Sequence, residues 1–192
     1  MRKLVYLVVL LLSVWGLKAQ QLEQGNSLIN LGVGMGSYIG SGSGYKTTLP
    51  PLEVSYEYLV NDNISVGGFF AMTKSEFNYS FPDLGGGSSS PQNFKFNYSY
   101  MMFGAIGNYH FVNNDKFDVY GGVRIGYNKV NVDYSSDDAT TDSLLKSINL
   151  DSSGMLFGAQ VGGRYFFTDN LAVNMEVGYG LAIAKLGLTL KL

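Results

Sequence analysis

The sequence predicts an all-β protein, an eight-stranded antiparallel up-and-down β-barrel, and three observations carry this prediction. No helical period of any length occurs after Gln20, apolar and polar residues alternate in eight runs, and short and long connections between the runs alternate. A period of two is typical of strands with two chemically different faces. The 192 residues fit one domain, because all-β barrels of this size are normally single domains.

The first residues have the layout of a secretory signal peptide. A positive start, Met1 to Lys3, precedes an apolar run from Leu4 to Trp15 and small residues up to Ala19. The run is too short for a spanning helix, which needs about 20 residues. We therefore predict a signal peptide at 1–19, cleaved after Ala19, and a barrel at 20–192. The chain has no cysteine, which excludes disulfides, thiolate metal sites and a lipid-anchored cysteine.

Eight strands are expected from the alternation. Leu52, Val54 and Tyr56 share one face of the second run, and in the sixth Val161 shares the apolar face while Gln160 lies on the opposite one. The expected strands cover about 27–36, 51–60, 64–74, 94–108, 117–129, 154–167, 171–180 and 184–192.

The connections predict a barrel with two different rims. Those near 61–63, 112–116 and 168–170 are short and rich in Asn and Asp, which suit hairpin turns. Those at 37–50, 75–93 and 130–153 are long and rich in Gly, Ser and Asp. Antiparallel strands place alternate connections at opposite ends, so one rim is trimmed and the other carries the loops.

The apolar face is predicted to face lipid, which makes the barrel a transmembrane one. This face has no Asp, Glu, Lys or Arg through the strand centres, whereas Gly, Ala and Ser dominate the opposite face and suit a narrow interior. Aromatic residues at both rims are typical of membrane barrels. The predicted belts are Tyr58, Phe111, Phe117, Tyr165 and Phe167 at the short-turn rim, and Tyr79, Tyr98, Tyr127 and Tyr179 at the other. A soluble lipocalin-type barrel would carry an early Gly-x-Trp motif, and the single tryptophan, Trp15, lies in the predicted signal peptide.

With these features the chain resembles the small outer-membrane β-barrel proteins of the OmpA/OmpX-like family, barrel domain only. The resemblance rests on the signal, the eight strands, the unequal rims and the last strand, Lys185 to Leu192. It implies the outer membrane of a Gram-negative-type bacterium after secretion to the periplasm, a monomer, and assembly by the barrel-insertion machinery. Leu192 stands where that family usually has Phe, and the peptidoglycan-binding domain of longer relatives is not expected.

A charge network is predicted in the lumen. Its members are Glu53, Glu57, Arg124, Arg164, Glu176 and Lys185, with Asp118 and Lys191 as further interior charges. Glu53, Arg124 and Lys185 should lie at similar heights, and Arg164 and Glu176 should be diagonal neighbours on the adjacent strands of one hairpin. Buried charges persist by pairing, so we interpret the network as a structural plug, with a gated ion path as the alternative.

No catalytic, cofactor or metal site is predicted. His110, the only histidine, adjoins the turn at 112–116 and is interpreted as an interfacial polar residue. The acidic loop at 131–153 lacks the spacing of a calcium loop. Without residues 1–19 the chain has 10 basic against 15 acidic residues, a net charge of −5, and no basic patch for nucleic acid.

The resemblance implies a structural outer-membrane barrel that presents surface loops at 37–50, 75–93 and 130–153, in contact with outer-membrane lipid and open to a surface ligand. The role would be envelope integrity or surface interaction. The alternative is a porin-like narrow pore for ions or small solutes. A lipid-modifying outer-membrane enzyme is a third hypothesis.

Overall fold

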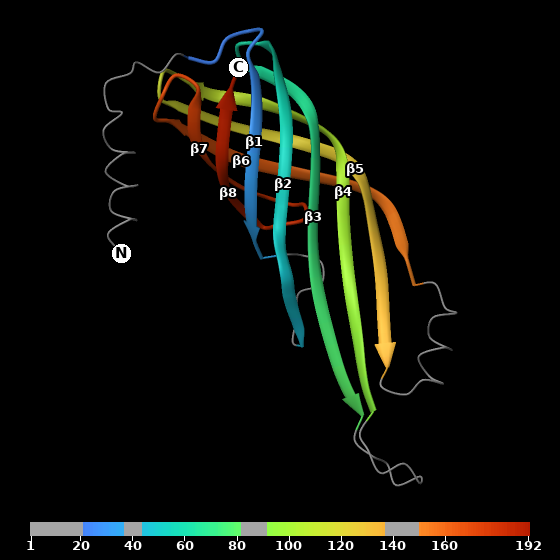
Figure 1. The fold of residues 1–192 in the computed structure, drawn as a ribbon. Helices are drawn as coiled ribbons and strands as arrows, with labels where there is room; N and C mark the ends of the chain where they lie inside the picture. Colours follow the sequence, from blue (N-terminus) through green and yellow to red (C-terminus); the bar gives the residue numbers. More distant parts are fainter. Residues whose placement is uncertain (1–20, 37–43, 82–91, 137–149) are drawn as a thin grey trace, which may run out of the picture.

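A computed structural model describes residues 21–36, 44–81, 92–136 and 150–192, so the predicted signal peptide lies outside the described residues. Eight antiparallel strands follow one another around a closed barrel, and β8 pairs with β1 (Figure 1). The predicted fold class is confirmed. The strands are β1 Ser27–Met35, β2 Tyr45–Asn61, β3 Ile64–Phe81, β4 Gln92–Asn113, β5 Phe117–Ser136, β6 Ser152–Phe166, β7 Leu171–Gly178 and β8 Ala184–Lys191.

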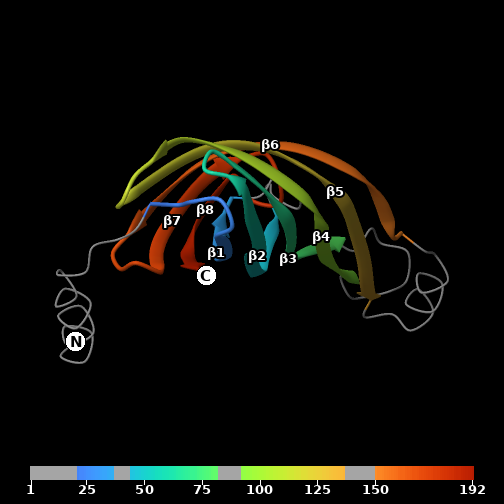
Figure 2. The same cartoon turned by 90° about the horizontal axis from the view of Figure 1, so that it is seen from above.

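The barrel closes between its first and last strands. Gly32 of β1 lies opposite Gly187 of β8, and the backbones of Ser27 and Leu192 exchange two hydrogen bonds at the short-turn rim. Figure 2 shows β4, β5 and β6 arching across one side of the ring, with β8, β1 and β2 on the other. No helix among the described residues has the length and apolar character to cross a membrane.

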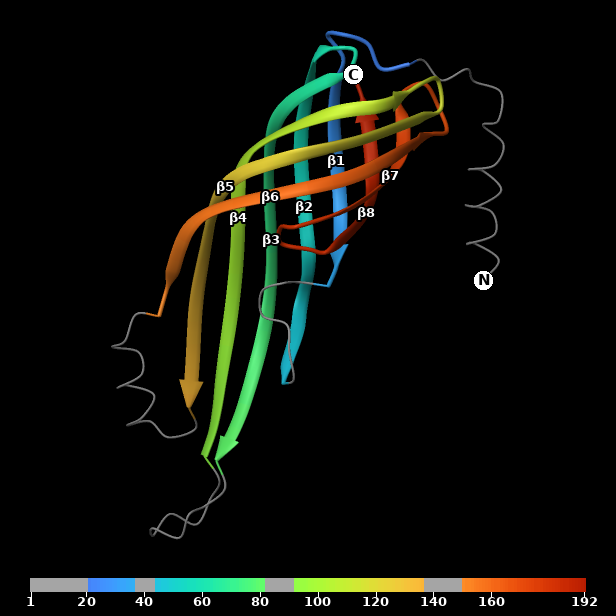
Figure 3. The same ribbon diagram turned by 180° about the vertical axis from the view of Figure 1, so that it is seen from behind.

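Three strands are longer than the sequence analysis predicted. β3, β4 and β5 have 18, 22 and 20 residues, against 8 in each of β7 and β8, and they project beyond the rest of the barrel (Figure 3). β2 also begins earlier, at Tyr45. The predicted loops at 37–50, 75–93 and 130–153 are therefore partly strand, which corrects their boundaries. We call residues 45–50, 74–81, 92–99 and 129–136 of these four strands the extension.

The polarity of the two faces is reversed in the extension. On the outward face, Met72 of β3 is followed by Lys74, and Tyr127 of β5 is followed by Lys129. On β4 of the extension, Tyr98 and Phe96 lie on the inward face, whereas Asn97 and Lys95 lie on the outward face. The alternation of side chains continues, but the outward residues become polar because water replaces lipid outside the extension. The pattern of apolar outward residues therefore ends before the strand does.

This reversal also corrects part of the predicted aromatic belts. Tyr98 lies on the inward face, where its ring stacks on that of Tyr100 with 6.2 Å between centroids, and Tyr79 stacks on Phe77. Phe167 lies half-buried in the turn after β6. The other predicted members are exposed at the rims, namely Tyr58, Phe111, Phe117, Tyr127, Tyr165 and Tyr179.

The interior has three layers. At the short-turn rim, Leu22 packs against four buried apolar residues, Leu28, Leu59, Phe166 and Ala172. Polar and charged side chains fill the middle. Toward the extension lies a second apolar cluster that comprises Phe69, Ala71, Tyr100, Met102, Ile106 and Leu181.

Candidate functional site

The middle layer contains two clusters of charged side chains, and we call the one nearer the extension the upper cluster. Two cations and two anions meet there. Arg124 Nη1 lies 2.9 Å from Glu53 Oε2, and its Nη2 lies 2.8 Å from Glu176 Oε1. Lys185 Nζ pairs with both carboxylates, at 2.6 Å from Glu176 Oε1. All four side chains are about nine-tenths buried.

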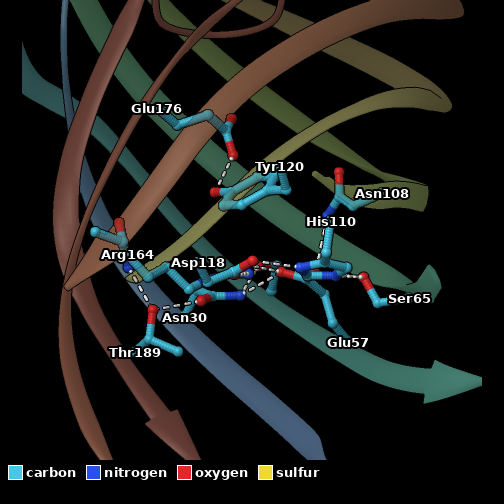
Figure 4. Close-up of polar contacts among 12 residues, drawn as sticks. Asn30, Glu57, Ser65, Asn108, His110, Asp118, Tyr120, Arg164, Glu176 and Thr189 are labelled. Carbon is cyan, nitrogen blue, oxygen red and sulfur yellow. Dashed lines mark hydrogen bonds and ion pairs between the residues drawn. The ribbon is translucent and has the colours of Figure 1, made fainter. Parts of the chain in front are cut away.

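The lower cluster is centred on Arg164, which is fully buried. Its guanidinium contacts Asp118 Oδ2 at 2.6 Å and also pairs with Glu57 Oε1. His110 Nδ1 lies 2.6 Å from the other oxygen of Asp118, and its Nε2 lies 3.1 Å from Ser65 Oγ. Figure 4 shows these side chains converging from β2, β3, β4, β5 and β6.

His110 lies between two oxygen atoms that hydrogen-bond to its ring. The Ser65 hydroxyl donates to Glu57 Oε2 at 2.8 Å, and the same oxygen faces His110 Nε2. Asp118 Oδ1 faces Nδ1 on the other side of the ring. The lower cluster therefore joins Arg164 and His110 to two carboxylates, those of Asp118 and Glu57.

Two amide side chains join the clusters. Gln160 accepts from Arg124 Nε at 2.6 Å and donates to Asn108 Oδ1 at 2.7 Å. Asn108 in turn donates to Glu57 Oε2 at 2.8 Å. The middle layer is thus one connected network, in which every charge has a partner of opposite sign, as burial in a low dielectric requires.

The structure places the six predicted lumen residues in this layer but divides them differently. It brings Glu53, Arg124 and Lys185 together with Glu176. Arg164 and Glu176 are diagonal neighbours as predicted, because Arg164 lies opposite Asn174 and Glu176 is two residues further along β7. The two side chains nevertheless form no ion pair, since Arg164 pairs with Glu57 and Asp118 instead. The ring of Tyr120 lies against Arg164, and its hydroxyl donates to Glu176 Oε2 at 3.1 Å (Figure 4).

His110 is not the interfacial residue that the sequence analysis predicted. Its side chain is fully buried and points into the barrel. The alternation along β4 could have shown this, because the neighbouring Tyr109 and Phe111 are exposed on the outward face. The same parity places Asn108 inside.

The contacts from Ser65 to His110 and from His110 to Asp118 follow the order of a catalytic Ser-His-Asp triad, but the surroundings do not suit that chemistry. A nucleophile must reach its substrate and give its proton to the histidine. Here Ser65 is fully buried, and its hydroxyl donates to Glu57 instead. The arrangement suits a structural hydrogen-bond network.

Two small cavities lie in the polar layer. One of about 20 Å³ lies between the two clusters, and one of about 10 Å³ lies beside Lys185 and Tyr179. Spaces of this size hold about one water molecule each. Within the described ranges, no three His, Asp or Glu side chains form a group that could hold a metal ion. Most of the acidic loop at 131–153 lies outside those ranges.

Comparison with known proteins places the chain among bacterial outer-membrane barrels. A sequence model described as "Outer membrane protein beta-barrel domain" matches residues 7–189. The structure is similar to that of Ail, the attachment invasion locus protein of Yersinia pestis, at 18% identity over 88% of this chain and 95% of that one, with a TM-score of 0.48.

Two other solved barrels are among the similar structures. OprG from Pseudomonas aeruginosa is 14% identical over 91% of this chain and 99% of its own, with a TM-score of 0.49. Outer Membrane Protein W of E. coli is 18% identical over 88% of this chain and 99% of its own, with a TM-score of 0.45. At these identities the likeness concerns the fold alone. No curated protein sequence matches the chain.

Proposed function

The chain belongs to the outer membrane protein β-barrel domain family, and from this premise we propose that it is a structural barrel that holds the extension at the cell surface for contact with a partner. The barrel resides in the bacterial outer membrane. The short-turn rim then faces the periplasm and the extension faces outward. Contact with the insertion machinery and a monomeric state remain predictions from the family.

The packed interior is the observation that supports a structural role. Apolar layers lie above and below the charge network, and the cavities between them have room for single waters. A conducting pore needs a continuous polar path, and neither apolar layer offers one. This supports a plugged barrel over a narrow pore.

The extension supports a role in surface contact. Four antiparallel strands continue beyond the apolar band, and their outward face carries Lys, Glu, Asn and Asp side chains that suit water. On β4 and β3, Lys95 Nζ lies 2.7 Å from Glu76 Oε2. A sheet held on a rigid barrel loses little conformational entropy when it binds a partner.

The single-channel conductance of purified protein in planar lipid bilayers tests the plugged interior. We expect no discrete openings above the background of heat-denatured protein. Stable and reproducible openings would overturn the proposal and favour the narrow pore. A lipid-modifying activity lost in His110→Ala would instead favour the enzyme hypothesis.

Site-specific photo-crosslinking on intact cells tests surface contact. A crosslinker at Asn97, on the outward face of the extension, should capture a surface partner. The same group at Lys116, in the periplasmic turn, is the matched control. Identical products at both positions would contradict a partner bound by the extension.

A further inference from the structure

An apolar groove crosses the outside of the barrel over β8, β1, β2 and β3. It has a volume of about 570 Å³ and lies between two rows of outward side chains. One row contains Leu31, Val54 and Phe70, the other contains Val33, Leu52 and Met72, and β8 adds a leucine to each. Between the rows the side chains point into the lumen, so the floor of the groove is strand backbone, including that of Gly32 and Gly187.

The groove has the dimensions of a lipid acyl chain. It spans four strands, which at about 4.8 Å between neighbours gives a length of roughly 14 Å. One leaflet of a bilayer supplies about half of a hydrocarbon core of roughly 30 Å. The groove is continuous with the lipid-exposed apolar face, since Leu31, Leu186 and Leu188 are each more than half exposed.

A cation stands where the headgroup of such a lipid would lie. Lys74 follows Met72 on the same face of β3, two residues or about 7 Å toward the cell exterior. It is exposed, and among the described residues no carboxylate forms an ion pair with it. An ammonium group at this height is complementary to a phosphate at the surface of the outer leaflet.

We propose that this face is a binding site for one outer-leaflet lipid with a phosphorylated headgroup, its acyl chain in the groove and its phosphate at Lys74. The groove is an open apolar depression between two rows of side chains. A flexible hydrocarbon chain can lie along such a depression, and the exposed ammonium group of Lys74 suits a phosphate beside its β3 end.

The test is titration of the purified protein in detergent micelles with bisphosphorylated lipid A, with bound lipids counted by native mass spectrometry. Wild type should bind one lipid. Val33→Trp fills the groove and should abolish this binding, whereas Val161→Trp, at an equally exposed valine on β6, should not. Folding of each variant is checked by its heat-dependent gel shift, and Leu31→Trp fills the groove from the other row if Val33→Trp does not fold.

The headgroup contact is tested separately. Lys74→Gln should weaken binding about fivefold, the effect of one lysine near a charged surface. Lys116→Gln at the periplasmic rim should not weaken binding. Dephosphorylated lipid should bind equally to the wild type and to Lys74→Gln. Three results would each overturn the proposal. The first is equal binding by wild type and both groove-filling variants, and the second is an equal effect of the two lysine changes. The third is a protein dimer in place of the lipid complex.

Discussion

The guanidinium carbon of Arg164 lies 4.1 Å from the centre of the Tyr120 ring, and this contact links the two charge clusters. The ring fills the space in which Arg164 and Glu176 would otherwise meet, while its hydroxyl donates to Glu176. The Tyr120 side chain therefore lies between the two charge clusters and contacts both, the lower one with its ring and the upper one with its hydroxyl.

Arg164→Ala should lower the unfolding midpoint in urea, read by the heat-dependent gel shift in micelles. The change leaves the buried carboxylates of Asp118 and Glu57 without the guanidinium that pairs with both. Removing one partner of a buried ion pair lowers the free energy of unfolding by about 3–5 kcal/mol. Lys116→Ala, on an exposed turn, should stay within about 0.5 kcal/mol. Equal midpoints for the two variants would mean that the lower cluster contributes no stability.

Tyr120→Phe should destabilise the barrel less than Tyr120→Leu. The phenylalanine keeps the ring against Arg164 and loses only the hydrogen bond to Glu176, worth about 1.5–3 kcal/mol for a charged acceptor. The leucine also loses the cation–π contact, worth about 2 kcal/mol when desolvated. Urea midpoints of both variants check this order, and the reverse order would show that the ring contact does not stabilise the fold.

Two adjacent glycines on β6 should respond differently to alanine. A Cβ at Gly162 would lie 2.5 Å from the Tyr120 ring and hydroxyl, whereas one at Gly163 would have its nearest atom at 3.7 Å. Gly162→Ala should therefore cost about 1–3 kcal/mol by overpacking, and Gly163→Ala much less. Unfolding midpoints distinguish them. Equal costs would place Tyr120 elsewhere in the lumen.

The boundary of the lipid can be located with two lysine substitutions on the outward face. Val161→Lys places an ammonium group in hydrocarbon, at a cost of about 2–4 kcal/mol near the midplane. Asn97→Lys lies in the extension opposite Glu76 on one side and Asp133 on the other, so it should cost nothing. Folding yield into lipid vesicles measures both, and an equal loss at the two positions would extend the lipid over the extension.

The sequence alone determined the barrel, because its signals are local. Neighbouring side chains point to opposite faces, so each strand records in its own residues which face meets lipid. Val161 is 55% exposed and Gln160 only 4%, as alternation predicted. The short polar turns are local signals too. They lie in LVNDNISV at 59–66, FVNNDKFDV at 111–119 and FFTDNLAV at 166–173, and they mark where one strand ends and the next begins.

Tertiary structure decided which side chains meet inside, because that depends on register between strands. Arg164 lies opposite Asn174, so its carboxylates come from β5 and from β2, 107 residues away in sequence for Glu57. His110 could be placed inside by parity, but its partners Ser65 and Asp118 come from two other strands. The extension was missed because a strand that leaves lipid for water reverses its pattern, and the height of that boundary is set by the barrel as a whole.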